Sequence, residues 1–218
     1  MTARPPRPRW VVFDFDGTLA DSYPCFVAAL EAVGPRYGLR PVPPPERDAL
    51  RHLGARAVMA RIGLSWWKVP LVARAVRRRM HADVARITPF PGVPEVLQSL
   101  HDAGHRIAIV TSNTRRTVDA VLGTARVQAL DAVQCDIAVL GKARALRRLL
   151  RSAGVAPADA LYVGDELRDA EAAAAVGMPF LGVAWGYTHP DALRAAAPGQ
   201  VVMTPHALLE AIEAAAHG

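Results

Sequence analysis

The spacing of hydrophobic positions changes twice along the chain. Trp10 to Phe13 is an unbroken apolar run, which is typical of a strand covered on both faces. From Leu19 to about residue 88 the apolar positions recur at helical spacing, and no strand pattern interrupts them. From Pro94 onward, short apolar runs alternate with helical segments. The pattern therefore predicts a helical insert between the first strand and the rest of an α/β chain.

The helical pattern of the insert predicts four helices. Ser22 is a candidate N-cap with Pro24 in the first turn, and Gly54 is expected to join two short helices. The expected helices are Ser22–Tyr37, Glu46–Leu53, Ala55–Ile62 and Pro70 to about Ile87. Trp66 and Trp67 lie in the link before the last helix. We expect both to pack in the core, with an internal interface or a dimer contact as the alternatives.

The second part of the chain alternates strands with helices. The expected strands are Arg106–Val110, a weaker one within Ala132–Val139, Leu161–Gly164, Phe180–Val183 and Gln200–Met203. The expected helices are Glu95–Ala103, Arg115–Leu122, Lys142–Ala153, Glu171–Val176 and Pro205–Ala216. This alternation is typical of a parallel sheet with right-handed crossovers. We therefore predict an α/β fold, with a Rossmann-like parallel sheet core and an inserted all-helical cap.

The expected boundaries follow from this pattern. The α/β core domain is predicted to comprise residues 10–18 and 89–218, and the helical cap domain residues 19–88. Residues 1–9 mix Pro with Arg and lack an apolar stretch, so we expect a short disordered tail and not a signal peptide. No apolar run is long enough for a membrane span. Cys25 and Cys135 lack metal-ligand spacing, so we expect two reduced thiols in a cytoplasmic protein.

The charged residues add one detail to this picture. The chain has 218 residues and a formal charge of +6, and nearly all its cations are Arg, because Lys occurs only at Lys68 and Lys142. The arginines are scattered and not clustered with aromatic residues, so we expect no nucleic-acid partner. Because Arg keeps its charge and favours bidentate contacts, an isolated Lys is a candidate for a specific function.

Polar side chains follow three of the predicted strands. They are Asp14 and Asp16, then Thr111, Ser112 and Asn113, then Asp165 with Asp169 four residues later; Lys142 opens a helix in between. Each alone has an ordinary explanation as a turn, a helix N-cap or a surface residue. The carboxyl ends of parallel strands share one edge of the sheet, where ligands bind. Carboxylates gathered there repel one another unless a hard cation such as Mg²⁺ is present, and hydroxyl and free N–H groups suit phosphate.

These motifs resemble those of a known family. Asp14-Phe-Asp-Gly-Thr18, the strand leading into Thr111-Ser112-Asn113, Lys142, and Gly164-Asp165-x-x-x-Asp169 are similar to the four motifs of the haloacid dehalogenase superfamily. The helical insert is similar to its C1 cap. Segments that resemble the phosphoglycolate-phosphatase-like branch are Phe90-Pro-Gly-Val-Pro94, Asp169-Ala-Glu-Ala-Ala173 and Trp185-Gly-Tyr187 with Pro190. The resemblance extends from about Trp10 to Ile212. One departure is Ala143, since many relatives have Pro after the lysine.

The resemblance implies a role for each motif residue. Asp14 would be the nucleophile that forms an aspartyl-phosphate, and Asp16 the general acid and base. Lys142 would neutralise Asp14 and the phosphoryl oxygens. The phosphate-binding residues would be Thr111, Ser112, Asn113 and Lys142. The Mg²⁺ ligands would be Asp14, the Asp16 carbonyl and Asp165, with Asp169 acting indirectly or through water.

The implied function is a Mg²⁺-dependent phosphatase acting on a small phosphorylated metabolite, with phosphoglycolate as the first candidate. Asp16 argues against dehalogenation, because breaking a carbon–halogen bond leaves no alkoxide to protonate. A sugar phosphomutase of the same superfamily is one alternative. A non-catalytic partner protein on the same scaffold is another, although loss of Asp14 or Asp16 would have been its signature.

The insert offers one candidate for substrate binding. Arg56, in the turn that begins at Gly54, is expected to reach toward an anionic substrate tail, and an ordinary exposed helix face explains it equally well. His52, His81, His101, His105 and His189 show no metal-ligand spacing, and we expect them to be structural or exposed. Glu166 and Arg168 are expected to pair with each other. A monomer and a homodimer are both compatible with the sequence.

Overall fold

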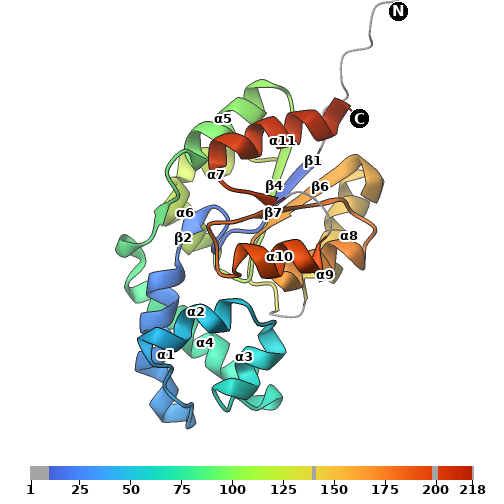
Figure 1. Ribbon diagram of the computed structural model, residues 1–218. Coiled ribbons are helices and arrows are strands. Elements are labelled where there is room, and N and C mark those ends of the chain that lie inside the picture. The colour runs from blue at the N-terminus through green and yellow to red at the C-terminus, as the bar shows by residue number, and fades with distance from the viewer. Residues whose placement is uncertain (1–9, 139–140, 198–200, 218) are drawn as a thin grey trace, which may run out of the picture.

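The centre of the fold is a six-stranded sheet (Figure 1). The computed structural model describes residues 10–138, 141–197 and 201–217. The strand order is β5-β4-β1-β6-β7-β8, and neighbouring strands pair in parallel. The strands are β1 (Trp10–Phe13), β4 (Arg106–Val110), β5 (Ala132–Gln134), β6 (Ala160–Gly164), β7 (Phe180–Val183) and β8 (Val201–Val202). The predicted α/β fold with a parallel sheet is confirmed.

Strand β1 lies at the point where the strand order reverses. Phe13 pairs with Ile109 of β4 on one side and with Val163 of β6 on the other. The chain continues from β1 to β4 and β5 on one side, and later adds β6, β7 and β8 on the other. In open α/β sheets, ligands bind beyond the carboxyl ends of the strands at such a reversal. The segment after Phe13 therefore begins at the expected place for a site.

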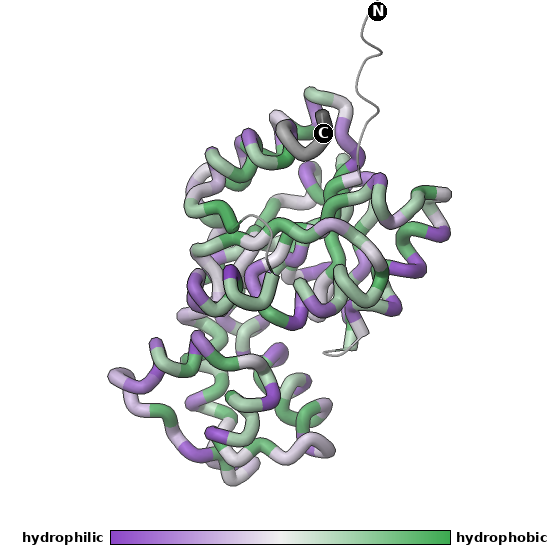
Figure 2. The backbone as a smooth tube through the Cα atoms, turned by 45° about the vertical axis from the view of Figure 1, so that its right-hand side comes forward, coloured by the Kyte–Doolittle hydropathy of each residue, from purple (hydrophilic) through white to green (hydrophobic). Residues whose placement is uncertain are grey.

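Helices cover both faces of the sheet. Val11 and Phe13 pack in a core with α5 (Val93–Asp102), α6 (Arg115–Leu122) and α11 (Pro205–His217), whereas Val12 packs with α8 (Lys142–Ala153) and α9 (Leu167–Ala174). Because successive strand side chains alternate between faces, the apolar run of β1 serves both cores. Two short helices complete this part, α7 (Thr124–Gln128) and α10 (Pro190–Ala196). Figure 2 shows hydrophobic residues along the central strands and hydrophilic ones on outer helical turns.

The residues between β1 and α5 form a helical insert, residues 23–86, at one end of the sheet (Figure 1). Its helices are α1 (Tyr23–Tyr37), α2 (Pro44–Arg51), α3 (Ala55–Arg61) and α4 (Val69–Ala82), with 3-10 turns at Trp66–Lys68 and Val84–Arg86. Helices α1 and α4 pack together. Their buried residues Cys25, Ala29, Val72 and Val76 belong to the same core as the β1 side chains on that face. The boundaries 19–88 for a cap domain stay a prediction.

Several element predictions were wrong. Two short antiparallel strands, β2 (Ala20–Asp21) and β3 (Thr88–Pro89), pair at the two ends of the insert, where no strand was expected. Helix α4 ends at Ala82 and not near Ile87. Helix α9 begins at Leu167, before the expected Glu171, because Glu166 and Asp169 form a capping box. Helices α7 and α10 were not predicted. The tail 1–9 lies outside the described residues, as do Val139 and Gln200 at the ends of two predicted strands.

The prediction that two tryptophans pack in the core was also wrong. Trp66 is 82% exposed and Trp67 58% exposed, so neither packs in the core. Ser22 occupies the N-cap position of α1, but its hydroxyl makes no capping bond. Instead Ser22 Oγ lies 2.9 Å from the hydroxyl of Tyr187, far along the chain. Ser22 therefore connects the start of the insert with the loop that follows β7.

Candidate active site

The turn after β1 places Asp14 and Asp16 at the edge of the sheet. The Asp14 N–H donates to the carbonyl of Val163 at 2.9 Å, which continues the pairing with β6 beyond the end of the strand. Gly17 has a φ of 76°, and a Cβ there would lie 2.3 Å from Oδ2 of Asp165. No other residue fits this position without displacing Asp165. The Gly of the first motif thus brings the turn directly against the carboxylate that follows β6.

Three buried carboxylates gather at this edge. Oxygen atoms of Asp14, Asp165 and Asp169 lie within 4.8 Å of one another. Burial raises the pKa of Asp14 to about 7, against the lowering effect of Lys142. Burial also raises the pKa of Asp165 well above its ordinary value, and the neighbouring carboxylates add to the rise. The group is therefore able to bind a metal ion, since a cation among these oxygens would favour their charged forms.

Lys142 supplies the positive charge inside this group. It is the first residue of α8, is buried, and places Nζ 2.6 Å from Oδ2 of Asp14. The same ammonium forms an ion pair with Oδ1 of Asp169. These two carboxylates raise the pKa of Lys142 although burial opposes the rise. The lysine that the sequence singled out thus lies against the aspartate that follows β1.

Asp165 and Asp169 are held by hydrogen bonds from several parts of the chain. Asp165 accepts from the Thr18 hydroxyl at 2.7 Å and from the Tyr187 N–H at 2.7 Å. Asp169 accepts from the Tyr162 hydroxyl at 3.2 Å and, through Oδ2, from the Glu166 N–H at 3.1 Å. Asp169 therefore connects the ammonium of Lys142 with the start of α9, which makes it a positioning residue for Lys142.

Asp16 belongs to a separate polar group that is partly open to solvent. The amide of Asn113 donates to both of its oxygens at 3.2 Å. Burial raises the pKa of Asp16, and hydrogen bonds from Ser22 and Asn113 act in the opposite direction. A carboxyl group with a raised pKa and fixed orientation suits proton transfer.

The segment after β4 differs in part from expectation. Thr111 is buried, and its hydroxyl accepts from the Asn113 N–H at 2.9 Å. The Thr111 N–H donates to the Gln134 carbonyl. The backbone N–H groups of Thr111 and Asn113 are therefore bonded within the protein, whereas the sequence analysis expected free N–H groups here for phosphate binding. The Ser112 carbonyl accepts from Arg77 of the insert at 3.0 Å. Donors to a phosphate at this strand end would therefore be hydroxyl groups and the Ser112 N–H.

The loop after β7 contributes residues that the sequence analysis did not assign to the site. A Cβ at Gly186 would lie 2.2 Å from the Asp165 side chain, and Tyr187 bonds to Asp165 and approaches Ser22. Trp185 donates to the Thr18 carbonyl at 3.1 Å. In the sequence analysis, Trp185-Gly-Tyr187 is only one of the segments that resemble the phosphoglycolate-phosphatase-like branch. Nothing in its spacing indicates contact with a residue so far away in the chain.

The insert reaches this loop through Arg51 rather than Arg56. Arg51 donates to the carbonyls of Tyr187 at 3.2 Å and Gly186 at 3.0 Å. Arg56 lies on the exposed surface of α3. Gly54 does approach the main part of the molecule, since a Cβ there would lie 3.8 Å from Leu167. Glu166 and Arg168 form an ion pair, as expected.

Comparison with known proteins shows the family of the chain. The family model for haloacid dehalogenase-like hydrolases matches residues 11–183. The chain belongs to this family. The resemblance inferred from the sequence motifs is thereby confirmed, and the four motif segments of this haloacid dehalogenase-like hydrolase are those that meet at the sheet edge.

Individual relatives of this family member cover most of its length. A phosphoglycolate phosphatase of Synechococcus elongatus is 36% identical over 203 residues, or 93% of this chain and 96% of the relative. An N-acetylmuramic acid 6-phosphate phosphatase of Pseudomonas aeruginosa is 32% identical, covering 83% of this chain and 84% of its own. A structure described as a predicted phosphatase from Clostridium acetobutylicum has a TM-score of 0.79 at 20% identity, covering 95% of this chain and 99% of its own. The solved structure shows the shared fold.

The described residues also bear on a membrane location. None of their helices combines the length and apolar character that crossing a bilayer requires.

Proposed function

We propose that this haloacid dehalogenase-like hydrolase is a Mg²⁺-dependent phosphatase that hydrolyses a small phosphorylated metabolite through an aspartyl-phosphate. The observation that carries the proposal is the contact between Asp14 and Lys142, 2.6 Å apart, beside Asp165 and Asp169. A carboxylate nucleophile with an adjacent ammonium suits attack on an anionic phosphate, because the ammonium balances charge on both reactants. Curated relatives that cover most of the chain are phosphatases by name.

The proposed metal ligands are Asp14 and Asp165, with the Asp16 carbonyl as a third and Asp169 in an indirect role. The fit rests on the donor set, which is all oxygen, and on burial that raises the pKa of Asp14 and Asp165. Mg²⁺ prefers one or two protein carboxylates together with water and phosphate oxygens. When bound, the ion would screen the charge between nucleophile and phosphate and polarise the phosphoryl group. Asp169 would hold Lys142 in place.

The proposed chemistry has two steps on this chain's own residues. An oxygen of Asp14 attacks phosphorus in line, and the bond from phosphorus to the leaving oxygen breaks as Asp16 donates its proton to that oxygen. Asp16 then accepts a proton from the water that attacks the aspartyl-phosphate, which releases phosphate and restores Asp14. The Asn113 amide and the Ser22 hydroxyl orient Asp16 for both transfers.

The proposed phosphate contacts come from the next strand and from α8. Lys142 and the Thr111 hydroxyl would hold the phosphoryl oxygens, with Ser112 as a further donor. Asn113 would act mainly through Asp16, because its amide already contacts both oxygens of that carboxylate. The helical insert would serve as the cap that excludes water and selects the leaving group.

The proposed substrate carries a carboxylate as well as a phosphate. The names of two relatives specify phosphoglycolate and N-acetylmuramic acid 6-phosphate, and both compounds contain these two groups. We take phosphoglycolate as the first candidate, since its relative has the higher identity. Arg56 is the proposed partner of the carboxylate. A cytoplasmic location and a monomeric or homodimeric state stay predictions.

Release of inorganic phosphate tests the proposal. The panel is phosphoglycolate, N-acetylmuramic acid 6-phosphate, glucose 6-phosphate and p-nitrophenyl phosphate, each with MgCl₂ or with EDTA. We expect multiple turnovers with Mg²⁺, the highest kcat/KM on a carboxylate-bearing substrate, and loss of activity in EDTA. Turnover of a sugar phosphate that needs a bisphosphate activator and releases no phosphate would favour the phosphomutase alternative. No turnover on any compound would favour a non-catalytic protein.

A further inference from the structure

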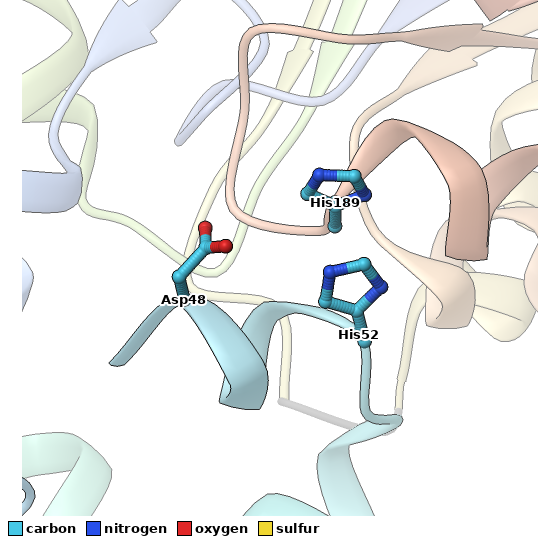
Figure 3. A group of neighbouring side chains, drawn as sticks. All are labelled: Asp48, His52 and His189. Atoms are coloured by element: carbon cyan, nitrogen blue, oxygen red, sulfur yellow. The ribbon is translucent and has the colours of Figure 1, made fainter. Parts of the chain in front are cut away.

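A second group of metal-binding side chains lies where the insert contacts the main part of the molecule (Figure 3). Asp48 belongs to α2, His52 follows its last residue, and His189 directly precedes α10. One donor atom from each of the three lies within 4.8 Å of the other two. The two imidazole rings are stacked, with centroids 3.9 Å apart and planes inclined by 23°. The expectation that both histidines are merely structural or exposed did not anticipate this contact.

We infer that Asp48, His52 and His189 form a site for a late first-row divalent ion such as Zn²⁺, which joins the insert to the loop before α10. Asp48 and His52 are four residues apart, so their side chains leave the same face of the helix and can bind one ion together. His189 supplies the third donor from the opposite side. Two imidazoles and a carboxylate suit Zn²⁺, Cu²⁺ or Ni²⁺, with a fourth position for water.

The backbone around these side chains is already fixed. The His189 N–H donates to the Arg51 carbonyl at 2.8 Å, and the Arg51 side chain bonds to the Tyr187 and Gly186 carbonyls. Ligands of tetrahedral Zn²⁺ at 2.0–2.1 Å are about 3.3 Å apart. The donors must therefore close from 4.8 Å or less to that distance. Asp48 and His52 are exposed, so both side chains are free to rotate, and the His52 ring would leave the stacked arrangement to direct a nitrogen at the ion.

Neighbouring charges leave donor atoms for the ion. Arg51 contacts Oδ1 of Asp48 at 3.2 Å, and the carboxylate can still bind through Oδ2. Nδ1 of His189 accepts from the Asp191 N–H at 3.3 Å and lies 3.7 Å from the Asp191 carboxylate. An ion bound to Nε2 of His189 would leave Nδ1 protonated. Nδ1 would then no longer accept from the Asp191 N–H and would donate to the Asp191 carboxylate instead. Such a carboxylate partner is usual for a metal-bound histidine.

The chemistry of this site separates it from the carboxylate group at the sheet edge. Asp14, Asp165 and Asp169 are buried and offer oxygen only, which favours Mg²⁺. Asp48 and His52 are exposed, and the histidines add nitrogen donors, which Mg²⁺ does not prefer. The two sites should therefore bind different ions at the same time. An ion at the second site requires donors from both parts, so it binds only while α2 lies against the loop.

Titration with Co²⁺ in excess Mg²⁺ tests the inference. Co²⁺ with histidine ligands in a tetrahedral or five-coordinate site absorbs visible light strongly, whereas an octahedral oxygen site absorbs weakly. We expect one equivalent of strongly absorbing Co²⁺ in the full chain, displaced by Zn²⁺. His52→Ala and His189→Ala should each weaken binding at least about tenfold, the loss typical even of an outer-shell partner. Asp48→Asn should weaken it as well.

His206 offers a matched control. It is an exposed histidine with an acidic residue, Glu210, four positions later, 3.6 Å away on α11. His206→Ala should leave Co²⁺ binding unchanged. Each variant is compared with itself with and without metal, and only the parent and His206→Ala should gain stability from Zn²⁺. Equal binding in every variant would overturn the inference. Loss in His52→Ala but not in His189→Ala would overturn the link between the two parts, because α2 would then bind the ion alone.

Discussion

At the scale of single residues, Asp14 and Lys142 are the most informative pair. Both side chains are buried and form an ion pair, and each favours the charged form of the other. Removing one partner of a buried ion pair normally leaves an uncompensated charge. Here Lys142 also pairs with Asp169, so loss of the Asp14 charge leaves the ammonium with a partner. This arrangement makes Asp14 suitable for a substitution that tests chemistry without unfolding the protein.

Asp14→Asn should therefore fold and yet lose phosphatase activity. Asparagine keeps the size of the side chain but is a poor nucleophile toward phosphorus, so we expect kcat to fall by about three orders of magnitude or more, about 4 kcal/mol of barrier. Phosphate release is the measurement. Asp21→Asn, at an exposed aspartate in β2, is the control and should keep full activity. If the Asp14 variant keeps more than about a tenth of kcat, Asp14 is not the attacking group.

Cys135 allows a prediction about pH. Burial raises the pKa of its thiol to about 11, with a smaller contribution from Asp136. Below that pH the protonated thiol dominates, and the thiolate is the reactive form. We expect alkylation of Cys135 by iodoacetamide to be slow at pH 8 and to rise about tenfold per pH unit up to about pH 11. Peptide mass spectrometry would follow it. A rate that levels off near pH 8–9, as for a free thiol, would contradict the prediction.

At the scale of elements, the contact between α2 and the loop after β7 connects the insert with the site. Arg51 bonds to the carbonyls of Gly186 and Tyr187, and Tyr187 in turn donates to Asp165. Arg56 lies one helix further along, on an exposed surface. The two arginines thus have different structural roles: Arg51 positions the insert, whereas Arg56 has a side chain available for a ligand.

Replacing each arginine by Ala should separate these roles. Arg51→Ala should raise KM for phosphoglycolate and for p-nitrophenyl phosphate by similar factors, because it weakens closure of the insert for any substrate. Arg56→Ala should raise KM mainly for phosphoglycolate, by about ten- to a hundredfold in kcat/KM if a charged hydrogen bond of about 1.5–3 kcal/mol is lost. Steady-state kinetics on both substrates is the measurement. Equal losses in the Arg56 variant would mean that it acts through folding of the insert, and no loss would leave it an ordinary surface residue.

The sequence predicted the elements whose signals are local. Trp10–Phe13 is uniformly apolar and forms the central strand, and Lys142–Ala153, which Gly154 follows, is a helix with the predicted bounds. The start of α9 was misplaced because Asp169 serves two purposes. Its spacing from Asp165 was interpreted only as part of a metal site. The same carboxylate also accepts a hydrogen bond from the Glu166 N–H at the start of the helix.

Contacts between distant residues were beyond prediction from local signals. Ser22 has the sequence context of an N-cap, but its hydroxyl lies beside that of Tyr187, and the stacking of His52 on His189 likewise depends on tertiary folding. Motif residues were an exception. Asp14 and Asp165 follow strands and Lys142 begins a helix between them, so the rule that parallel strands share a carboxyl edge was enough to place the three residues together.

At the scale of the whole molecule, the buried carboxylates should link stability to Mg²⁺. An ion that binds the folded chain at a hundred times its Kd stabilises it by about 2.7 kcal/mol, and a chain of this size gains about 2–4 °C in Tm per kcal/mol. We expect MgCl₂ to raise Tm by about 5–10 °C relative to EDTA, measured by differential scanning calorimetry. Asp165→Asn should lose most of this difference, whatever its Tm in EDTA. An equal rise in both proteins would rule out Asp165 as a ligand.

The pairing of β2 with β3 has a consequence for how such a chain can diversify. Ala20 faces Pro89 and Asp21 faces Thr88, so the chain departs for the insert and returns at neighbouring points. We expect a segment of another length between these points to leave the strand order unchanged, because it would begin and end at the same place in the fold. The pairing of the two short strands holds both ends of the insert together while the segment between them varies. A recombined chain could thus acquire a new substrate range in one exchange while inheriting its reaction chemistry intact.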